Sequence, residues 1–322
     1  MKAGKENNWG HKIAGIGNSL GAWLIVILMA LILSVTTKAF LTPNNIINVV
    51  RQISVNAMVA LGASFVVLGG EIDLSTGMAS TFAGCNAALM MTKLGMPMIP
   101  AIIICLVVGV LVGCFTGFIV TILKIPAFIG SLGVQYMVQG ATLLLTNSMP
   151  ISGLSEEFLV LGRGYIANVI PVPTVIMAVF IIIGAIVLKY TPFGRSVISV
   201  GENATAARLS GIDVTRTKIA IFAICGFCAA AAGIVQASRL SSGQPASGGD
   251  LSLQALAAVY VGGTFKGSML NTLAGALALG LVNNGLNLMG INPYWQKMAL
   301  GIIIVLAVLF DQYRIKKSTA RK

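Results

Sequence analysis

Charged residues and histidine are scarce in this sequence. Of its 322 residues, 9% are charged, against roughly 25% in an ordinary soluble domain. The only histidine, His11, lies in a basic N-terminal stretch, which excludes histidine-based metal sites and catalytic triads. A G-x-x-x-x-G-K-[ST] sequence is also absent, so the chain has no Walker A loop for nucleotide phosphates. If ATP drives this protein, another subunit must hydrolyse it.

The number and location of the cysteines do not indicate a disulfide framework. All five cysteines fall inside apolar stretches, where pairing of the secreted type is not expected. Cys225 and Cys228 make a C-x-x-C, but it lies within an apolar helical stretch and not at a strand-to-helix turn. Packing by small side chains is the favoured interpretation, and a redox or metal role is the alternative.

Apolar stretches of about twenty residues dominate the chain, and its mean hydropathy is +0.92. The sequence therefore predicts an all-α fold, a polytopic integral membrane protein with about ten transmembrane helices, two of them Gly-interrupted. The third follows residue 77 and ends near 91; the others are expected at about 19–40, 46–70, 100–123, 127–146, 173–188, 219–237, 253–263, 270–289 and 295–310.

The net charge of +12 is concentrated in three polar segments. Because Lys and Arg accumulate on the cytoplasmic side, these segments predict a topology rather than a nucleic-acid partner. We expect a cytoplasmic N-terminal tail at 1–18, a membrane domain at 19–311 and a basic cytoplasmic tail at 312–322. The third polar segment, 189–218, is then cytoplasmic too, and both termini lie on that side.

A short helix is expected inside the segment 189–218, from Asn203 to Ser210. The Asn203 side chain is a good N-cap, and Gly211 suits the left-handed position that ends a helix. So short a helix is not stable alone, because nucleation is costly, and something must pack against it. The alternative is a solvated loop with a frayed turn.

The second apolar stretch ends at Gly69 and Gly70 and is followed by two carboxylates, Glu71 and Asp73. A charge at the bilayer centre costs about 2.5 kcal/mol or more, so these carboxylates must face an interface, a water-filled cavity or a partner, or be protonated. The alternatives are a tight loop at the membrane surface and, for Asp73 before Ser75, a helix start.

Two features of the apolar stretches have direct structural meaning. Val66–Gly70 has an echo in Val259–Gly263, which indicates a duplication with paired interrupted segments, although chance similarity is the alternative in a glycine-rich chain. Glycines at 109, 113 and 117 share one helix face and predict close approach of another helix.

Uncharged amides recur at helical spacing within two of the apolar stretches. Amides both donate and accept, which suits transient contact with a hydroxylated neutral solute, and hydrogen bonding between helices is the competing interpretation. With the polar residues after Gly70 they make up a hypothetical translocation path: Asp73, Ser75, Gln135, Gln139, Asn283, Asn284 and Asn287.

Several motifs resemble the permease subunits of ribose-type monosaccharide ABC importers. They are GENATAARLSGI at 201–212, IDLS at 72–75, ASRLSSGQP at 237–245 and NNGLNLMG at 283–290. The resemblance extends from about residue 40 to the end. The chain departs from it at Glu71, where the family usually has Gly, and in the shorter stretch 262–268.

The resemblance implies a permease dimer, of two copies or of homologues, with one pathway through the inner membrane of a bacterium. It also implies a separate cytoplasmic ABC ATPase that binds ATP and Mg²⁺, and a periplasmic or surface sugar-binding protein. The segment 189–218 would then be a coupling segment seated in the ATPase through Gly201, Asn203, Ala206, Ala207, Arg208, Ser210, Gly211 and Ile212.

The sequence thus predicts a permease that moves a ribose-like neutral sugar by alternating access, with no catalytic residue and no cofactor of its own. An ion-coupled secondary transporter of a small polar solute is the main alternative. An intramembrane enzyme that uses Glu71 and Asp73, and a passive channel or purely structural subunit, are more distant ones.

Overall fold

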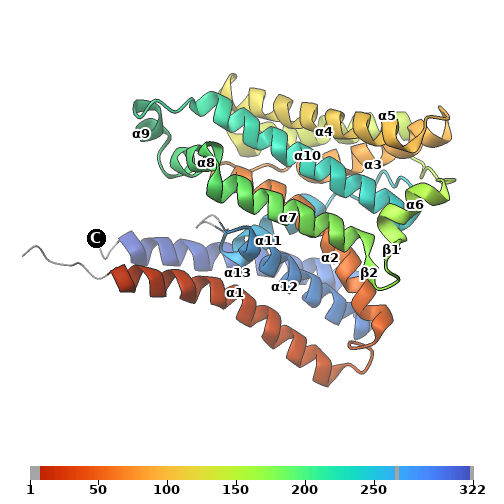
Figure 1. Cartoon of the computed structure of the whole chain (residues 1–322), viewed down its shortest axis with the longest axis horizontal. Coiled ribbons are helices and arrows are strands. Elements are labelled where there is room, and N and C mark those ends of the chain that lie inside the picture. Colours follow the sequence, from red (N-terminus) through yellow and green to blue (C-terminus); the bar gives the residue numbers. More distant parts are fainter. Residues whose placement is uncertain (1–7, 265–267, 320–322) are drawn as a thin grey trace, which may run out of the picture.

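The computed structural model describes residues 8–264 and 268–319, and nearly all of them are helical. Ten of the helices pack together in one bundle (Figure 1). They are α1 (Asn8–Thr36), α2 (Pro43–Leu68), α3 (Thr76–Thr92), α4 (Met98–Thr121), α5 (Ala127–Thr146), α7 (Val172–Tyr190), α10 (Val214–Leu240), α11 (Leu251–Gly262), α12 (Met269–Leu288) and α13 (Pro293–Thr319).

Shorter elements lie at the two ends of the bundle (Figure 1). The stretch 147–171 between α5 and α7 contains α6 (Glu156–Arg163) and a small antiparallel hairpin, β1 (Tyr165–Ile166) and β2 (Ile170–Pro171), in which Ile166 pairs with Ile170. At the other end, α8 (Pro192–Glu202) and α9 (Ala204–Leu209) follow α7.

Six helices of the described chain are long and apolar enough to cross a membrane: α2, α4, α5, α7, α10 and α12. Three shorter apolar helices add to them, at 21–36, 251–262 and 293–306. The predicted α-helical, multi-pass membrane architecture is therefore confirmed. The count of about ten spans is not, and it stays a prediction.

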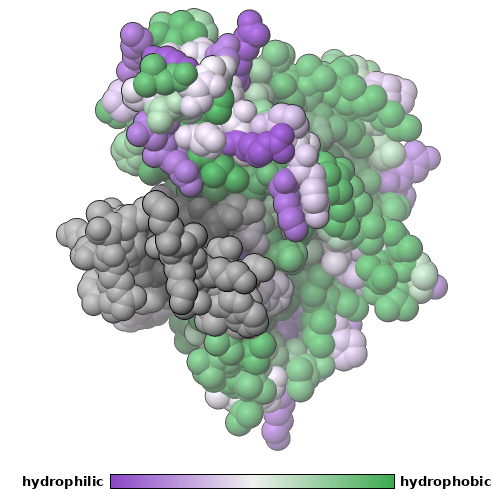
Figure 2. Space-filling view, turned by 60° about the vertical axis from the view of Figure 1, so that its left-hand side comes forward, coloured by the Kyte–Doolittle hydropathy of each residue, from purple (hydrophilic) through white to green (hydrophobic). Residues whose placement is uncertain are grey.

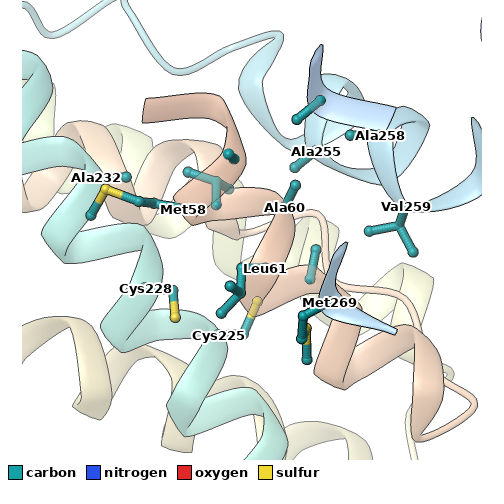
Figure 3. Packing of buried hydrophobic residues seen from close by; sticks show 14 of the residues in the cluster. Met58, Ala60, Leu61, Cys225, Cys228, Ala232, Ala255, Ala258, Val259 and Met269 are labelled. Atoms are coloured by element: carbon teal, nitrogen blue, oxygen red, sulfur yellow. The ribbon is translucent and has the colours of Figure 1, made fainter. Parts of the chain in front are cut away.

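The core forms where α2 and α10 pack against each other and α11 and α12 cover the far side of α2. Figure 3 shows Met58 and Leu61 of α2 between the thiols of α10 and the alanines of α11. A Cβ at Gly62 would lie 2.8 Å from the Cys228 Cβ, and both Cys225 and Cys228 are buried free thiols. These contacts support packing as the role of the C-x-x-C.

The predicted close approach of a helix to the glycine face of α4 is confirmed, and that helix is α10. A Cβ at Gly109 would lie 2.6 Å from the Gly226 carbonyl oxygen, and one at Gly113 only 2.2 Å from that of Phe222. The fit is mutual, because a Cβ at Gly226 would lie 2.1 Å from the Gly109 carbonyl oxygen. Only glycine allows two helix backbones to approach so closely.

The start of α1 and the end of α13 lie at the same end of the bundle as α8 and α9 (Figure 1). In Figure 2, which brings this end forward, hydrophilic side chains gather over α8 and α9 at the top, beside largely hydrophobic flanks. The α6 helix and the hairpin lie at the opposite end. The bundle thus has one end that carries the segment 189–218 and a second that carries α6.

Candidate functional site

Local sequence explains α8, which the sequence analysis did not predict. The Thr191 hydroxyl accepts a hydrogen bond from the Gly194 amide at 3.1 Å, and Pro192 occupies the first turn, where no amide donor is needed. Phe193, Val197 and Val200 lie on one face, and the two valines are buried. Their spacing of four and three residues was the available signal for an amphipathic helix.

The α9 helix begins and ends as its sequence predicts. The Asn203 Oδ1 accepts from the amides of Thr205 and Ala206, each at 3.0 Å, and Asn203 itself has the extended backbone of an N-cap. Gly211 has a φ of +84°, the left-handed conformation expected after a helix end. The helical residues run from Ala204 to Leu209, within the predicted bounds.

The packing partner that α9 needs comes from its own chain. Ala207 is buried against Val200 of α8 and Val214 of α10. The opposite face is bare: Leu209 is 86% exposed, and Arg208, Ser210 and Gly211 are exposed beside it. The predicted coupling residues therefore divide into an inner contact at Ala207 and an outer tip around Leu209.

The end of α8 touches the break between α2 and α3 directly. Gly70 has a φ of +80°, and a Cβ built there would lie 3.4 Å from Gly201. The fit is closer from the other side, since a Cβ at Gly201 would lie 1.8 Å from the Leu68 carbonyl oxygen. Gly201 is thus required where the segment 189–218 meets the α2 terminus.

An ion pair joins the same two segments. The Lys218 ammonium of α10 binds the Glu71 carboxylate, and the side chains are 20% and 17% exposed. From the sequence, Glu71 is expected to face an interface, a water-filled cavity or a partner, or to be protonated. No specific partner residue could be named. No local pattern gives this pair, because the two residues are 147 positions apart.

Asp73 is buried and binds Ser75, the residue before α3, but it accepts from no amide of α3 itself. Its Oδ1 accepts from the Ser75 amide at 2.8 Å and from the Ser75 hydroxyl at 2.6 Å. The segment is also tied to α5, because the Leu74 amide donates to the Ser131 hydroxyl at 3.1 Å. The carboxylate thus fixes the backbone of the break.

A second break separates α11 from α12, with Gly263 at a φ of +66°. Hydroxyls link the first break to the start of α11, and they link α2 to α12 near the second break. Ser252 of α11 donates to the Leu74 carbonyl at 2.6 Å and accepts from the Gly77 amide at 2.7 Å. Ser64 of α2 and Thr272 of α12 share a hydrogen bond of 2.7 Å. The shortened stretch noted in the sequence includes residues 265–267, which lie outside the described residues.

The amides of the hypothetical path fall into two separate groups. Gln135 and Gln139 are half-buried on α5, which packs against α3 and α4, whereas α12 packs against α1, α2 and α11. Within α12, Asn284 exchanges two hydrogen bonds with Asn45 of α2, at 2.8 and 3.2 Å. A single chain therefore does not bring the two groups together.

Asn287 of α12 also bonds to a neighbouring helix, as Asn284 does. The Asn287 Oδ1 accepts from Gln296 of α13 at 2.8 Å, so these two amides link helices, which was the competing interpretation. Asn283 is half-buried. Sequence reasoning did not identify the partners Asn45 and Gln296. Asn45 lies near Pro43 and Gln296 near the start of α13, and nothing in the sequence around either residue indicates a bond to α12.

An open apolar groove of about 340 Å³ lies between α3, α4 and α5, near the α5 amides. Its lining is hydrocarbon: Phe82, Val108, Leu111, Val112, Phe115, Val134, Met137, Val138 and Ala141. Such a surface offers no hydrogen bonds to a sugar. Among the described residues, no three His, Cys, Asp or Glu side chains are grouped so that they could hold a metal ion.

Residues 45–308 match the family model described as the permease component of branched-chain amino acid transport systems. The ribose import permease protein RbsC of Haemophilus influenzae is 40% identical over 300 residues, which cover 91% of this chain and 92% of that protein. RbsC of Bacillus subtilis is 38% identical over 304 residues, covering 92% and 94%.

The xylose transport system permease protein XylH of Haemophilus influenzae is 30% identical, with 91% of this chain and 95% of that protein covered. No solved structure matches. The family model covers more than three quarters of the chain, and the similar permeases align with nearly their whole length. The chain, an α-helical membrane protein with a capped helix exposed at one end, therefore belongs to this family of transport-system permease components.

Proposed function

We propose that this chain is the permease subunit of an ABC importer for a neutral monosaccharide of the ribose or xylose class. The similarity to ribose and xylose permeases over nine tenths of the chain supports the substrate class. The half-buried amides of α5 and α12 are compatible with a hydroxylated solute that is bound briefly and released.

The contact between Gly201 and the α2 terminus is the observation that carries the proposed mechanism. A separate cytoplasmic ATPase binds ATP and Mg²⁺ and grips the exposed tip of α9. When the ATPase closes, α9 moves with α8, and Gly201 and Lys218 transmit the movement to the break at Gly70 and Glu71. The spans then alternate between outward-open and inward-open arrangements.

Further subunits complete the proposed importer. A second copy or homologous permease supplies the other half of the pathway, which brings the α5 and α12 amides of two chains to one axis. A periplasmic or surface sugar-binding protein delivers the sugar. The protein is placed in the inner membrane, with tails 1–18 and 312–322 and the segment 189–218 in the cytoplasm and the permease domain at 19–311.

Uptake by proteoliposomes tests this function. The permease is reconstituted with a candidate ABC ATPase and a candidate sugar-binding protein, and entry of radiolabelled ribose and xylose is followed. We expect uptake that requires ATP, the ATPase and the binding protein together. Uptake driven by a proton or sodium gradient without ATP would instead identify an ion-coupled transporter.

A further inference from the structure

Three arginines converge at the end of the bundle opposite α9, where α6 meets the end of α10 (Figure 1). Arg51 of α2 donates to the carbonyl of Arg163 of α6, and the Arg163 Nε donates to the carbonyl of Arg239 of α10 at 3.0 Å. A Cβ at Gly162 would lie 2.2 Å from the Arg239 amide nitrogen, so the two helix ends are in close contact. These contacts to backbone carbonyls bring the three arginine residues to the same place at this end of the bundle.

No ion pair of the described residues neutralises this cluster, although α6 carries Glu156 and Glu157 in its first turn. The ion pairs of the described residues join Arg216 to Asp213, Lys218 to Glu71 and Lys297 to Asp250, and none involves the cluster. Arg51 and Arg239 carry like charges and are both half-buried, which makes positive charge without a counter-ion costly here. One N–H of Arg51 and one N–H of Arg163 cap backbone carbonyls at the ends of α6 and α10. This capping uses only two donors and does not explain why three like charges lie in one region.

Buried donors in the cluster also lack acceptors. The Nε atoms of Arg51 and Arg239 are buried and find no hydrogen-bond partner among the described residues. Both side chains are half-buried, whereas Arg163 is exposed. A guanidinium has five N–H donors in a fork that matches the oxygens of a phosphate. An anion placed beside the exposed nitrogens would supply the missing counter-ion.

The neighbouring hairpin presents an apolar surface to the same region. The Arg51 guanidinium lies over the Tyr165 ring, 4.6 Å from its centroid. Ile166 and Ile170 are each 47% exposed, and Val169 at the hairpin turn is 72% exposed. Aromatic, basic and exposed apolar side chains at the ends of membrane helices are typical of residues at the depth of lipid headgroups.

From this juxtaposition we propose that Arg51, Arg163 and Arg239 bind the phosphate of an anionic phospholipid whose acyl chain lies along the β1–β2 hairpin. The cluster supplies positive charge, and the hairpin supplies the apolar contact. The site therefore selects a phospholipid whose headgroup has no positive group to neutralise its phosphate. This lipid site is separate from the sugar pathway and does not depend on the proposed transport function.

Native mass spectrometry of the full-length protein in detergent tests the proposal, with phosphatidylglycerol and phosphatidylcholine titrated separately. We expect phosphatidylglycerol to bind more tightly, and Arg163→Gln to weaken its binding about tenfold through loss of a charge-assisted contact. Arg163→Lys keeps the charge but loses the donor fork, so it should retain only part of the affinity. Arg195→Gln, an exposed charge on α8 at the opposite end, is the matched control and should have no effect.

Two further measurements separate a lipid from a free anion. Val169→Asp on the hairpin should weaken phosphatidylglycerol binding while Arg163 remains in place, and inorganic phosphate should not protect the protein against thermal unfolding. Equal affinity for the two lipids, or equal loss in Arg163→Gln and Arg195→Gln, would overturn the proposal. Protection by inorganic phosphate that is unaffected by Val169→Asp would reassign the cluster to a soluble anion.

Discussion

The Lys218 ammonium binds the Glu71 carboxylate and ties the beginning of α10 to the break between α2 and α3. Both side chains are more than three quarters removed from solvent. Such a pair is stronger than an ion pair on an exposed surface, and loss of one partner leaves the other charge poorly solvated.

Glu71→Gln should therefore lower the free energy of unfolding by about 1–3 kcal/mol, since a charge-assisted hydrogen bond is lost and the Lys218 charge stays behind. The exchanged pair Glu71→Lys with Lys218→Glu should recover most of that loss. Unfolding in detergent measures the stability, and ATP-dependent sugar uptake measures function. No recovery in the exchanged pair would mean that the residues act separately.

Gly201→Ala should destabilise the protein by about 1–3 kcal/mol or prevent its folding, because the new Cβ would lie 1.8 Å from the Leu68 carbonyl oxygen. Gly140→Ala on α5 is the matched control, since nothing lies within 4 Å of its Cβ position. That change should be neutral or stabilise the helix by about 0.5–1 kcal/mol. Thermal unfolding of the two variants in the same detergent gives the comparison.

Ser252→Ala removes one hydroxyl that both donates to the Leu74 carbonyl and accepts from the Gly77 amide. Two buried backbone groups lose their partner, so a loss of about 1–3 kcal/mol is expected. Hydrogen exchange at the start of α3 should become faster. Ser196→Ala is the control, because that hydroxyl donates only to the Pro192 carbonyl within α8, and equal effects of the two changes would contradict the link between the first break and the start of α11.

A substitution on the exposed side of α9 should reduce coupling to the ATPase without changing the stability of the fold. Leu209→Glu changes a side chain that is 86% exposed, so stability should stay within about 0.5 kcal/mol. The activity of the assembled ATPase, stimulated by sugar-loaded binding protein, should nevertheless fall at least about tenfold, because one apolar contact with the partner becomes a buried charge. Unchanged stimulation would show that the tip of α9 does not touch the ATPase.

Asn203→Ala tests the cap of the same helix. Its loss should destabilise α9 locally by about 1 kcal/mol, because the amides of Thr205 and Ala206 lose their shared acceptor. Asn203→Asp keeps the acceptor and is the control. Amide exchange across 204–209 reports the cap, and a protection pattern unchanged in Asn203→Ala would mean that packing of Ala207 alone holds the helix.

Local signals in the sequence predict local structure well in this chain. Asn203 and Gly211 mark the ends of α9 because capping depends on a few neighbouring residues. The glycine spacing on α4 likewise indicated a close helix contact, although it did not name α10 as the partner. Long apolar stretches predict the fold class because each one specifies a membrane-spanning helix by its own length and composition.

Contacts between distant segments were beyond sequence reasoning. The pairs Glu71–Lys218 and Asn45–Asn284 depend on how whole helices are placed, and amide residues on an apolar helix look alike whether they line a path or bond to another helix. The helix α8 was missed because its apolar spacing is short and follows directly on a spanning stretch.

The glycine contact between α4 and α10 has a consequence for motion. Backbone lies against backbone at Gly109 and Gly226, so at this point no side chain separates the two helices. We therefore expect α4 and α10 to move together as one rigid unit. Any rearrangement of the bundle then has its pivots elsewhere, at the two breaks with left-handed glycines, Gly70 and Gly263.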